Sequence, residues 1–313
     1  MRVAFLGNDP WSVAPLRALV EATNIELELV VTNPPRPAGR GSQLTPTAVA
    51  DAARTLDLPL LEVDRIRDGE GFAALDLLEP DAIVVVAYGE ILTPDVLDIP
   101  RLGAVNVHFS LLPRWRGAAP VQRAILEGDE VTGVTVMLMD EGMDTGPVLA
   151  TVEAVIEAEE DAGSLGARLA EIGSPLLVET LRGLDGGTVT PSSQDHSAAT
   201  YAPKILPEER TIHWDEPADH IVRRIRSLAP DPGAVTTFRE GRLKVLVARA
   251  IDEWERTVDP SVPGVVERWE RDPLVRAWPG LVELLEVAPA GRKRMSGEDW
   301  ARGAKIQPGE RLG

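Results

Sequence analysis

Two polar side chains with complementary chemistry, Asn106 and His108, stand two residues apart in the sequence. Val105 and Val107 alternate with them, which predicts a short strand whose successive side chains point to opposite faces, so that the amide and the imidazole share one face. Side-chain N–H groups placed together in this way suit an oxyanion that forms when a carbonyl is attacked. The alternative is that each residue is a buried polar group with an ordinary hydrogen-bond partner.

The loop after this strand favours a ligand site over that alternative. Residues 109–120 contain two prolines, one glycine and two arginines, and open α/β sheets bind their ligands beyond the carboxyl ends of the strands. The preceding buried strand, at residues 81–88, leads into Tyr88 and Gly89 beside the same edge. This turn either lines a pocket for a flat heterocycle or is a plain connection between a strand and a helix.

A third candidate lies in the acidic loop at residues 140–147. Three carboxylates in one loop usually belong to a solvated turn. Asp144 stands between Gly142 and Gly146 and is suited to being held rigidly, and a carboxylate beside His108 would orient the imidazole or accept a proton. The sequence spacing leaves both interpretations open.

The elements that must position these residues follow an α/β pattern. The chain of 313 residues is long enough for two domains. The first turn, at residues 7–11, lacks the G-x-G-x-x-G spacing of dinucleotide-binding folds, which argues against a nicotinamide-dependent oxidoreductase. The pattern predicts strands at 2–7, 25–32, 58–61, 81–88, 103–108 and 132–139, and helices at 13–22, 47–56, 71–78, 121–127 and 162–184.

The last third of the chain has a different pattern. Residues 186–209 are rich in Gly, Thr, Pro and Ser, which is typical of a linker. A helix is predicted at 218–228, and its three arginines most simply form a solvated basic face. Short apolar runs broken by Pro and Gly, near 234–239, 243–250, 263–268, 274–278 and 281–287, then predict a small antiparallel β-barrel of a kind that often binds oligonucleotides.

Composition excludes several classes of protein. The absence of cysteine removes disulfides, thiolate nucleophiles and cysteine metal sites together, and no His, Asp and Glu spacing is typical of a metal site. No apolar run approaches the roughly 18–20 residues that a membrane span needs. The N-terminus has too few apolar residues for a signal peptide, so a cytoplasmic protein is expected.

The net charge of −18 is unevenly distributed. Residues 1–190 hold 13 Arg and 30 acidic residues, a net charge of −17, whereas residues 191–313 carry −1. Two stretches without acidic residues, 29–50 and 99–126, leave room for contact with a polyanion. The first includes a proline-rich stretch, residues 33–47, predicted as a stiff loop that is either a solvated excursion or an arm presenting Arg36 and Arg40 to phosphates. Arg292, Lys293 and Arg294 form another basic cluster.

Taken together, these motifs closely resemble the methionyl-tRNA formyltransferases over essentially the whole chain. Residues 106–113 (NVHFSLLP) and 116–120 (RGAAP) together are specific to folate-dependent formyltransferases, and residues 140–146 (DEGMDTG) match as well. Residues 36–41 (RPAGRG) resemble the loop with which this family engages the tRNA acceptor end. The segments at 8–11 and 33–35 depart from the family pattern. Further matches are at 204–205, 226–228, 232–234 and 289–296.

The resemblance implies an α/β fold: a Rossmann-like formyltransferase domain with a mostly parallel sheet, followed by a small OB-like antiparallel β-barrel domain. The implied domains are a formyl-folate-binding catalytic domain at 1–186, a linker at 187–209 and a tRNA-binding domain at 210–313. It implies that 10-formyltetrahydrofolate is the formyl donor and that methionyl-initiator tRNA is the acceptor. It implies no metal. No membrane partner is expected. The protein is expected to be a monomer.

Residue by residue, the resemblance assigns the catalytic roles to Asn106, His108 and Asp144. The expected folate contacts are Ser110, Leu111, Leu112 and Pro113, together with Tyr88 and Gly89. The expected tRNA contacts are Arg36, Arg40, Arg292 and Lys293.

Other functions compete with this reading. A formyltransferase for an amino sugar nucleotide or a purine precursor would share the core but would not need the arm at residues 36–41. A formyl-folate hydrolase would leave both the arm and the C-terminal domain unexplained. A non-catalytic tRNA-binding protein would have no need for the intact Asn106, His108 and Asp144.

Overall fold

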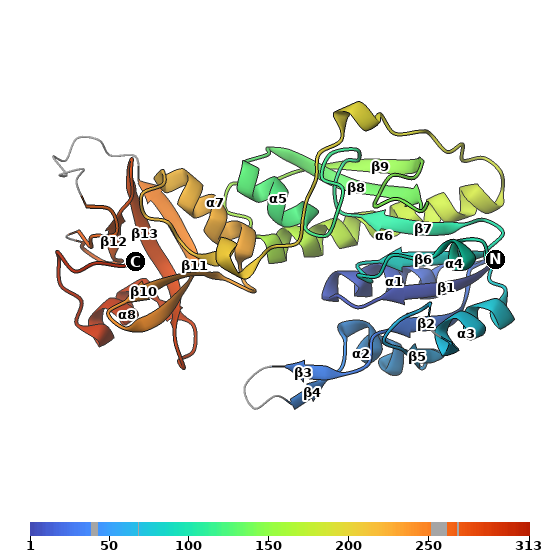
Figure 1. The fold of residues 1–313 in the computed structure, drawn as a ribbon, viewed down its shortest axis with the longest axis horizontal. Helices are drawn as coiled ribbons and strands as arrows, with labels where there is room; N and C mark the ends of the chain where they lie inside the picture. Colours follow the sequence, from blue (N-terminus) through green and yellow to red (C-terminus); the bar gives the residue numbers. More distant parts are fainter. Residues whose placement is uncertain (39–42, 68, 252–261, 268) are drawn as a thin grey trace. The chain divides into compact units, whose positions relative to one another are not determined.

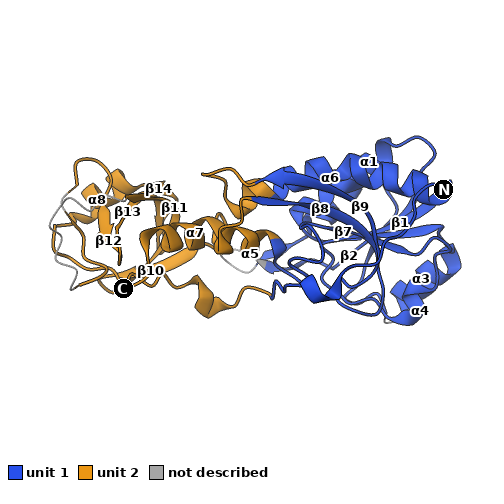
Figure 2. Cartoon of the chain, turned by 90° about the horizontal axis from the view of Figure 1, so that it is seen from above, with its two compact units in different colours: residues 1–120, 131–155, 166–203 blue, residues 121–130, 156–165, 204–313 orange. Residues whose placement is uncertain are grey.

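The computed structural model describes residues 1–38, 43–67, 69–251, 262–267 and 269–313. The chain divides into two compact units (Figure 2). Unit 1 contains residues 1–120, 131–155 and 166–203, and unit 2 contains residues 121–130, 156–165 and 204–313. Arg40, which was predicted to contact tRNA, lies outside the described residues.

Unit 1 is built on a seven-stranded sheet of order β5-β2-β1-β6-β7-β8-β9 (Figure 1). The four strand pairs from β5 to β7 are parallel, whereas β8 and β9 are added antiparallel. The predicted mostly parallel α/β domain is therefore confirmed. The strands are β1 (Arg2–Gly7), β2 (Glu26–Thr32), β5 (Leu60–Glu62), β6 (Ala82–Val86), β7 (Ala104–His108), β8 (Val131–Leu138) and β9 (Val148–Val155).

Helices cover both faces of this sheet. Helices α1 (Val13–Glu21) and α6 (Ala162–Asp185) lie on one face, and α3 (Glu70–Leu78) and α4 (Pro94–Leu97) lie on the other (Figure 2). Because both faces are covered, all five residues of β6 are buried, as its unbroken apolar sequence predicts. Helix α2 (Ala48–Thr55) and the 3-10 turns at Pro10–Ser12 and His196–Ala198 complete unit 1, whereas nearly all of α5 (Pro120–Glu127) belongs to unit 2.

Several elements of unit 1 differ from the prediction, among them α4, which was not predicted. The stretch at 33–47 is not a plain loop, because β3 (Arg36–Ala38) and β4 (Gln43–Thr45) pair antiparallel within it. Their side chains are exposed where they are described, so the segment lacks the alternation that marks a half-buried strand. Strand β9 was not predicted, since it forms the edge of the sheet and most of its residues are only partly buried or exposed.

Unit 2 holds a five-stranded sheet of order β10-β11-β13-β12, with β14 also paired to β13. These pairs are all antiparallel, which confirms the predicted small antiparallel β domain. The elements are α7 (Ala218–Leu228), β10 (Ala234–Phe238), β11 (Gly241–Ile251), β12 (Leu274–Arg276), β13 (Leu281–Pro289), β14 (Met295–Ser296), α8 (Gly297–Ala304) and the 3-10 turn at Pro207–Arg210. Within the strand predicted near 263–268, the described residues 263–267 form isolated bridges at Val265 and Val266.

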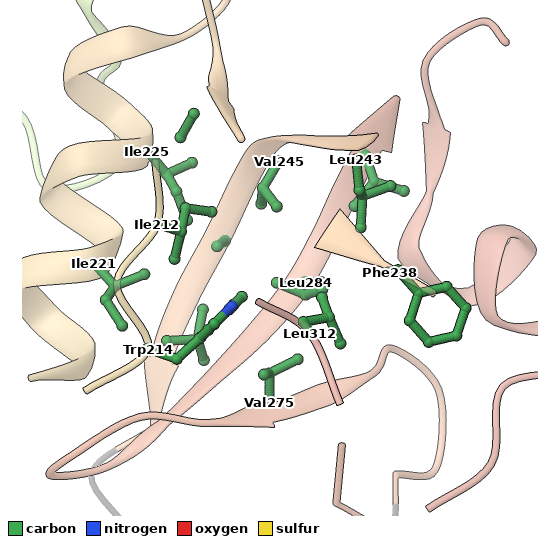
Figure 3. Packing of buried hydrophobic residues seen from close by; sticks show 14 of the residues in the cluster. Ile212, Trp214, Ile221, Ile225, Phe238, Leu243, Val245, Val275, Leu284 and Leu312 are labelled. Carbon is green, nitrogen blue, oxygen red and sulfur yellow. The ribbon is translucent and has the colours of Figure 1, made fainter. Parts of the chain in front are cut away.

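The core of unit 2 lies between α7 and the sheet (Figure 3). Ile221 and Ile225 of α7 are completely buried, as are Val245 and Leu284 of the strands. The indole Nε1 of Trp214 is also buried, and it donates a hydrogen bond to Thr236 Oγ1 at 3.0 Å. The helix predicted at 218–228 is therefore present, and its apolar residues form its buried face.

The arginines of α7 do not form the solvated basic face that was predicted. Arg224 Nη2 lies 2.8 Å from both carboxylate oxygens of Glu216. Arg226 donates from Nε and Nη2 to the carbonyl oxygens of Glu160 and Glu157, each at 2.9 Å, and burial lowers the pKa of its guanidinium. The partners lie up to 69 residues away in the sequence, so helical spacing could not reveal them.

Candidate active site

Strand β7 places Asn106 and His108 at its carboxyl end, between a parallel neighbour and an antiparallel one. Asn106 pairs with Val85 of β6 and with Met137 of β8, and His108 pairs with Thr135 of β8. The His108 side chain is only 6% exposed. The two side chains approach the same carboxylate, as the predicted alternation along this strand requires.

That carboxylate belongs to Asp144, in the loop between β8 and β9. Its Oδ1 accepts a hydrogen bond from Asn106 Nδ2 at 3.4 Å, and its Oδ2 lies 3.7 Å from His108 Nδ1. The backbone N–H of Gly117 also donates to Oδ2, at 2.7 Å. The structure therefore brings the three predicted catalytic residues together.

The other carboxylates of the acidic loop have different surroundings. Asp140 Oδ1 accepts hydrogen bonds from the backbone of Gly142 at 3.1 Å and from Thr145 Oγ1 at 2.6 Å, which closes a local turn. Glu141 is exposed. The solvated-turn interpretation thus fits part of this loop, whereas Asp144 faces inward.

The contacts of the His108 ring define its protonation chemistry. Nε2 lies 2.9 Å from the carbonyl oxygen of Trp115, and a carbonyl oxygen only accepts hydrogen bonds, so we assign a proton to Nε2. In the neutral ring, Nδ1 then carries the lone pair, and it faces Asp144. His108 can therefore take up a proton at Nδ1, beside an amide donor and a carboxylate.

The turn that follows β7 is fixed to β8. Thr135 Oγ1 donates to the carbonyl oxygen of Ser110 at 2.7 Å and accepts from the backbone N–H of Leu112 at 3.1 Å. The Ser110 hydroxyl is fully buried and donates to the carbonyl oxygen of Arg114 at 2.7 Å. Two of the predicted folate contacts, Leu111 and Pro113, are only partly buried in this turn.

The other predicted folate contacts, Tyr88 and Gly89, follow β6, the strand that pairs with β7. The Tyr88 side chain is 4% exposed within the apolar core, and burial raises the pKa of its phenol. Among the described residues, its hydroxyl has no hydrogen-bond partner. Gly89 has a φ of +84°, and no atom lies within 4 Å of the position a Cβ would take. This turn thus offers exposed backbone at Gly89 rather than the Tyr88 ring.

The two segments that depart from the family pattern contact each other near this turn. Asn8 Nδ2 donates to Asn33 Oδ1 at 2.9 Å, and the backbone N–H of Asn33 donates to Asn8 Oδ1 at 2.7 Å. Asn8 Nδ2 also donates to the carbonyl oxygen of Tyr88. The residues after β1, β2 and β6 are therefore tied together at the edge of the sheet that carries the candidate site.

The described residues predicted to contact tRNA are exposed. Arg36 lies on β3, with its Nη2 3.8 Å from Asp64 Oδ1. Arg292 and Lys293 lie in the turn between β13 and β14 of unit 2.

Gly117, Arg116 and Gln194 contribute to the site although their roles were not predicted. Gly117 has a φ of +122°, and a Cβ there would lie 2.7 Å from the carbonyl oxygen of Ala202, so only glycine fits. Gln194 donates to the backbone of the Asp144 loop and accepts from Arg116. A glycine directly after Arg116 is a local signal for such a turn, but nothing near Gln194 in the sequence marks it.

Two features are absent from the part of the chain that the structure describes. No group of three or more His, Asp or Glu residues there could hold a metal ion. No helix there is long and apolar enough to cross a membrane.

Comparison with known families agrees with these features. A family described as "Formyl transferase" matches residues 1–181, and a second, described as "Formyl transferase, C-terminal domain", matches residues 204–305.

Curated relatives cover the whole chain. A methionyl-tRNA formyltransferase from Roseiflexus sp. (strain RS-1) is 44% identical over 313 residues, which cover 100% of this chain and 95% of the relative. Another from Halorhodospira halophila is 45% identical, covering 99% of this chain and 98% of the relative.

Solved structures at low identity support the fold. HypX from Aquifex aeolicus, in complex with tetrahydrofolic acid, matches with a TM-score of 0.68 at 17% identity, covering 96% of this chain and 47% of that one. An N-formyltransferase from Helicobacter canadensis, in complex with folinic acid and dTDP-3-aminofucose, matches with a TM-score of 0.65 at 14% identity, covering 90% and 98%. The fold is thus shared by proteins with different names, and it does not by itself select an acceptor.

Proposed function

This chain belongs to the methionyl-tRNA formyltransferases, and we propose that Asn106, His108 and Asp144 are the residues with which it performs the reaction. The enzyme transfers a formyl group from 10-formyltetrahydrofolate to the α-amine of methionyl-initiator tRNA, for translation initiation. The observation that carries the assignment is the Asp144 carboxylate, which lies 3.4 Å from the Asn106 amide and 3.7 Å from the His108 ring.

The reaction begins when the α-amine attacks the formyl carbon of the donor. A C–N bond forms, and the carbonyl oxygen takes the displaced electron pair as an oxyanion. The Asn106 amide has two N–H groups. One is directed at Asp144 Oδ1, and we assign the other to the oxyanion, together with the protonated His108.

The proton of the attacking amine must then leave it. Asp144 accepts this proton, while the protonated His108 keeps its own proton on Nδ1, which faces the Asp144 carboxylate at 3.7 Å. When the tetrahedral intermediate collapses, the C–N bond to the folate nitrogen N10 breaks, and that nitrogen takes the proton. The products are formylmethionyl-tRNA and tetrahydrofolate. The formyl group has moved from N10 to the amine, and one proton has moved from the amine to N10.

The remaining assignments belong to the same proposal. Ser110, Leu111, Leu112, Pro113 and Gly89 would contact the folate, together with the backbone of Tyr88, whose ring is buried. The support is their position at the ends of β6 and β7. Arg36, Arg40, Arg292 and Lys293 would contact tRNA phosphates, since guanidinium and ammonium groups neutralise them. We divide the chain into a catalytic domain at 1–186, a linker at 187–209 and a tRNA-binding domain at 210–313, acting as a cytoplasmic monomer.

The acceptor is tested by incubating the protein with 10-formyltetrahydrofolate and one of three acceptors: methionyl-initiator tRNA, an amino sugar nucleotide or water alone. We expect formylmethionine after ester hydrolysis of the tRNA product, at a rate far above folate turnover in the other two reactions. His108→Ala should abolish formylation, and Arg40→Ala should chiefly weaken tRNA affinity or selectivity. Folate turnover without tRNA formylation would keep the catalytic centre and move the acceptor to a small amine or to water.

A further inference from the structure

Residues 190–203 run along unit 1 and approach the loop that carries Asp144. Ser192 and Val148 exchange two backbone hydrogen bonds of 2.8 Å. Further along, the backbone N–H of Arg116 donates to the carbonyl oxygen of Thr200 at 2.9 Å. Gln194 lies between these two attachments and is 7% exposed.

The Gln194 amide joins two parts of the candidate site. Its Nε2 donates to the carbonyl oxygens of Asp144 at 3.0 Å and of Gly146 at 2.7 Å. Its Oε1 accepts from Arg116 Nε at 3.1 Å and from Arg116 Nη2 at 2.7 Å. Both polar ends of this buried side chain are therefore used.

Arg116 determines which way that amide points. A guanidinium group donates hydrogen bonds and accepts none, so Oε1 must face Arg116 and the NH₂ group must face the two carbonyls. Arg116 is itself 2% exposed, and its Nη2 lies 3.2 Å from Nδ1 of His196. Arg116 is buried and offers no acceptor to the amide NH₂ group, so it fixes the orientation of Gln194.

The backbone that Gln194 binds has an unfavourable conformation. Asp144 has a φ of +53°, in the left-handed region that residues other than glycine rarely adopt. Such a conformation persists only where the surroundings hold it. Gly117 binds the Asp144 carboxylate, and Gln194 binds the Asp144 carbonyl oxygen from the other side of the residue.

We infer that Gln194 is a positioning residue, which holds the backbone of residues 144–146 so that the Asp144 carboxylate stays between Asn106 and His108. The inference rests on the proposed role of Asp144 in formyl transfer. Among the described residues, Gln194 has no hydrogen bond to Asn106 or His108, so its effect on turnover is expected to pass through Asp144.

Gln194→Glu separates this role from simple packing. The variant has the same size and keeps an oxygen acceptor for Arg116, but it replaces the NH₂ donor with a second oxygen that faces two carbonyls. We expect kcat to fall roughly 10- to 100-fold, as small misplacements of reacting groups do, with KM for both substrates nearly unchanged. Asp195→Asn is the matched control, because Asp195 is exposed in the same segment and its carboxylate accepts from the backbone N–H and the hydroxyl of Ser197, outside the candidate site.

The decisive comparison repeats Gln194→Glu in an Asp144→Asn background, with single-turnover formylation as the readout. If Gln194 acts through Asp144, the second substitution costs little further activity, because coupled positions are not additive. An equal loss in both backgrounds would overturn the inference about Gln194 and leave the proposed site intact. A normal kcat for Gln194→Glu in the native background would do the same. A normal kcat for Asp144→Asn by itself would instead refute the proposed site, and the inference would fall with it.

Discussion

The imidazole of His108 is held between two fixed groups, with Nδ1 3.7 Å from Asp144 Oδ2 and Nε2 2.9 Å from the carbonyl oxygen of Trp115. The Trp115 contact fixes the ring plane and keeps a proton on Nε2. Only Nδ1 is then left to exchange a proton with the reacting groups. In the proposed mechanism, the pair His108 and Asp144 therefore acts as one proton-handling unit beside the Asn106 amide.

Asp144→Asn tests this unit with almost no change of shape. The variant keeps one oxygen for the Gly117 N–H, but it loses the negative charge that accepts a proton and supports a protonated His108. We expect kcat to fall by roughly 10²–10⁴-fold, the usual contribution of a positioned acid or base. Steady-state kinetics with both substrates saturating measures this loss, and a thermal melt that matches the native protein excludes unfolding as its cause. A kcat within about threefold of the native value would contradict the assignment.

Gly117→Ala should damage stability as well as turnover. The residue has a φ of +122°, and a Cβ would lie 2.7 Å from the carbonyl oxygen of Ala202. We expect the free energy of unfolding of unit 1 to fall by about 1–3 kcal/mol. Gly303→Ala is the control, because a Cβ at this helical glycine meets no atom within 4 Å and the change should be neutral or stabilising. Urea denaturation followed with both variants measures the difference, and equal effects would refute the steric account.

Stability should depend on pH through Glu209. Hydrogen bonding to Arg123 holds the pKa of Glu209 below its ordinary value of 4.5, with Nη1 and Oε1 2.6 Å apart. A carboxyl with a lowered pKa stabilises the folded state above its unfolded pKa, and this contribution disappears as the pH falls through the folded value. Glu209→Gln should therefore cost about 0.5–1 kcal/mol at pH 7. Denaturant unfolding should show that cost shrinking below about pH 4.5, and an equal cost at pH 7 and pH 4 would contradict the ion pair.

The basic turn of unit 2 should control the dependence of tRNA binding on salt. Arg292 and Lys293 are both exposed there. If each neutralises one phosphate, Arg292→Ala or Lys293→Ala should weaken tRNA binding and reduce the slope of log K against log salt by about 1. Arg302→Ala is the control, because Arg302 contacts Glu298 and Asp299 on its own helix. Binding titrations at several salt concentrations would reject the assignment if all three slopes agreed.

Local patterns predicted the central strands, and they singled out three residues that the structure brings close together. The alternation at 104–108 and the unbroken apolar run at 82–86 depend on burial by neighbours in the sheet, and burial leaves a periodic trace in the sequence. Asp144 could be identified because glycines flank it and a known motif contains it. The short distance between Asp144 and His108 could not be predicted, because the two residues are 36 positions apart in the sequence.

The missed features are those whose partners are distant and whose own surroundings are polar. Gln194 stands between Ser193 and Asp195 and has no apolar periodicity, yet its amide contacts residues 48 and 50 positions away. Arg226 looked solvated because its acceptors are main-chain oxygens of a separate segment. Sequence patterns report burial of apolar side chains, and such polar contacts depend on the assembled fold.

The most direct test of formyl transfer at this site is the single-turnover rate of Asn106→Ala and Asn106→Asp with 10-formyltetrahydrofolate and methionyl-initiator tRNA. Loss of one oxyanion donor should lower the rate of Asn106→Ala by roughly 10²–10³-fold. Asn106→Asp should lose at least as much, because a second carboxylate would face both Asp144 and the oxyanion. Near-normal rates in both variants, with folate and tRNA still bound, would contradict the catalytic role of Asn106.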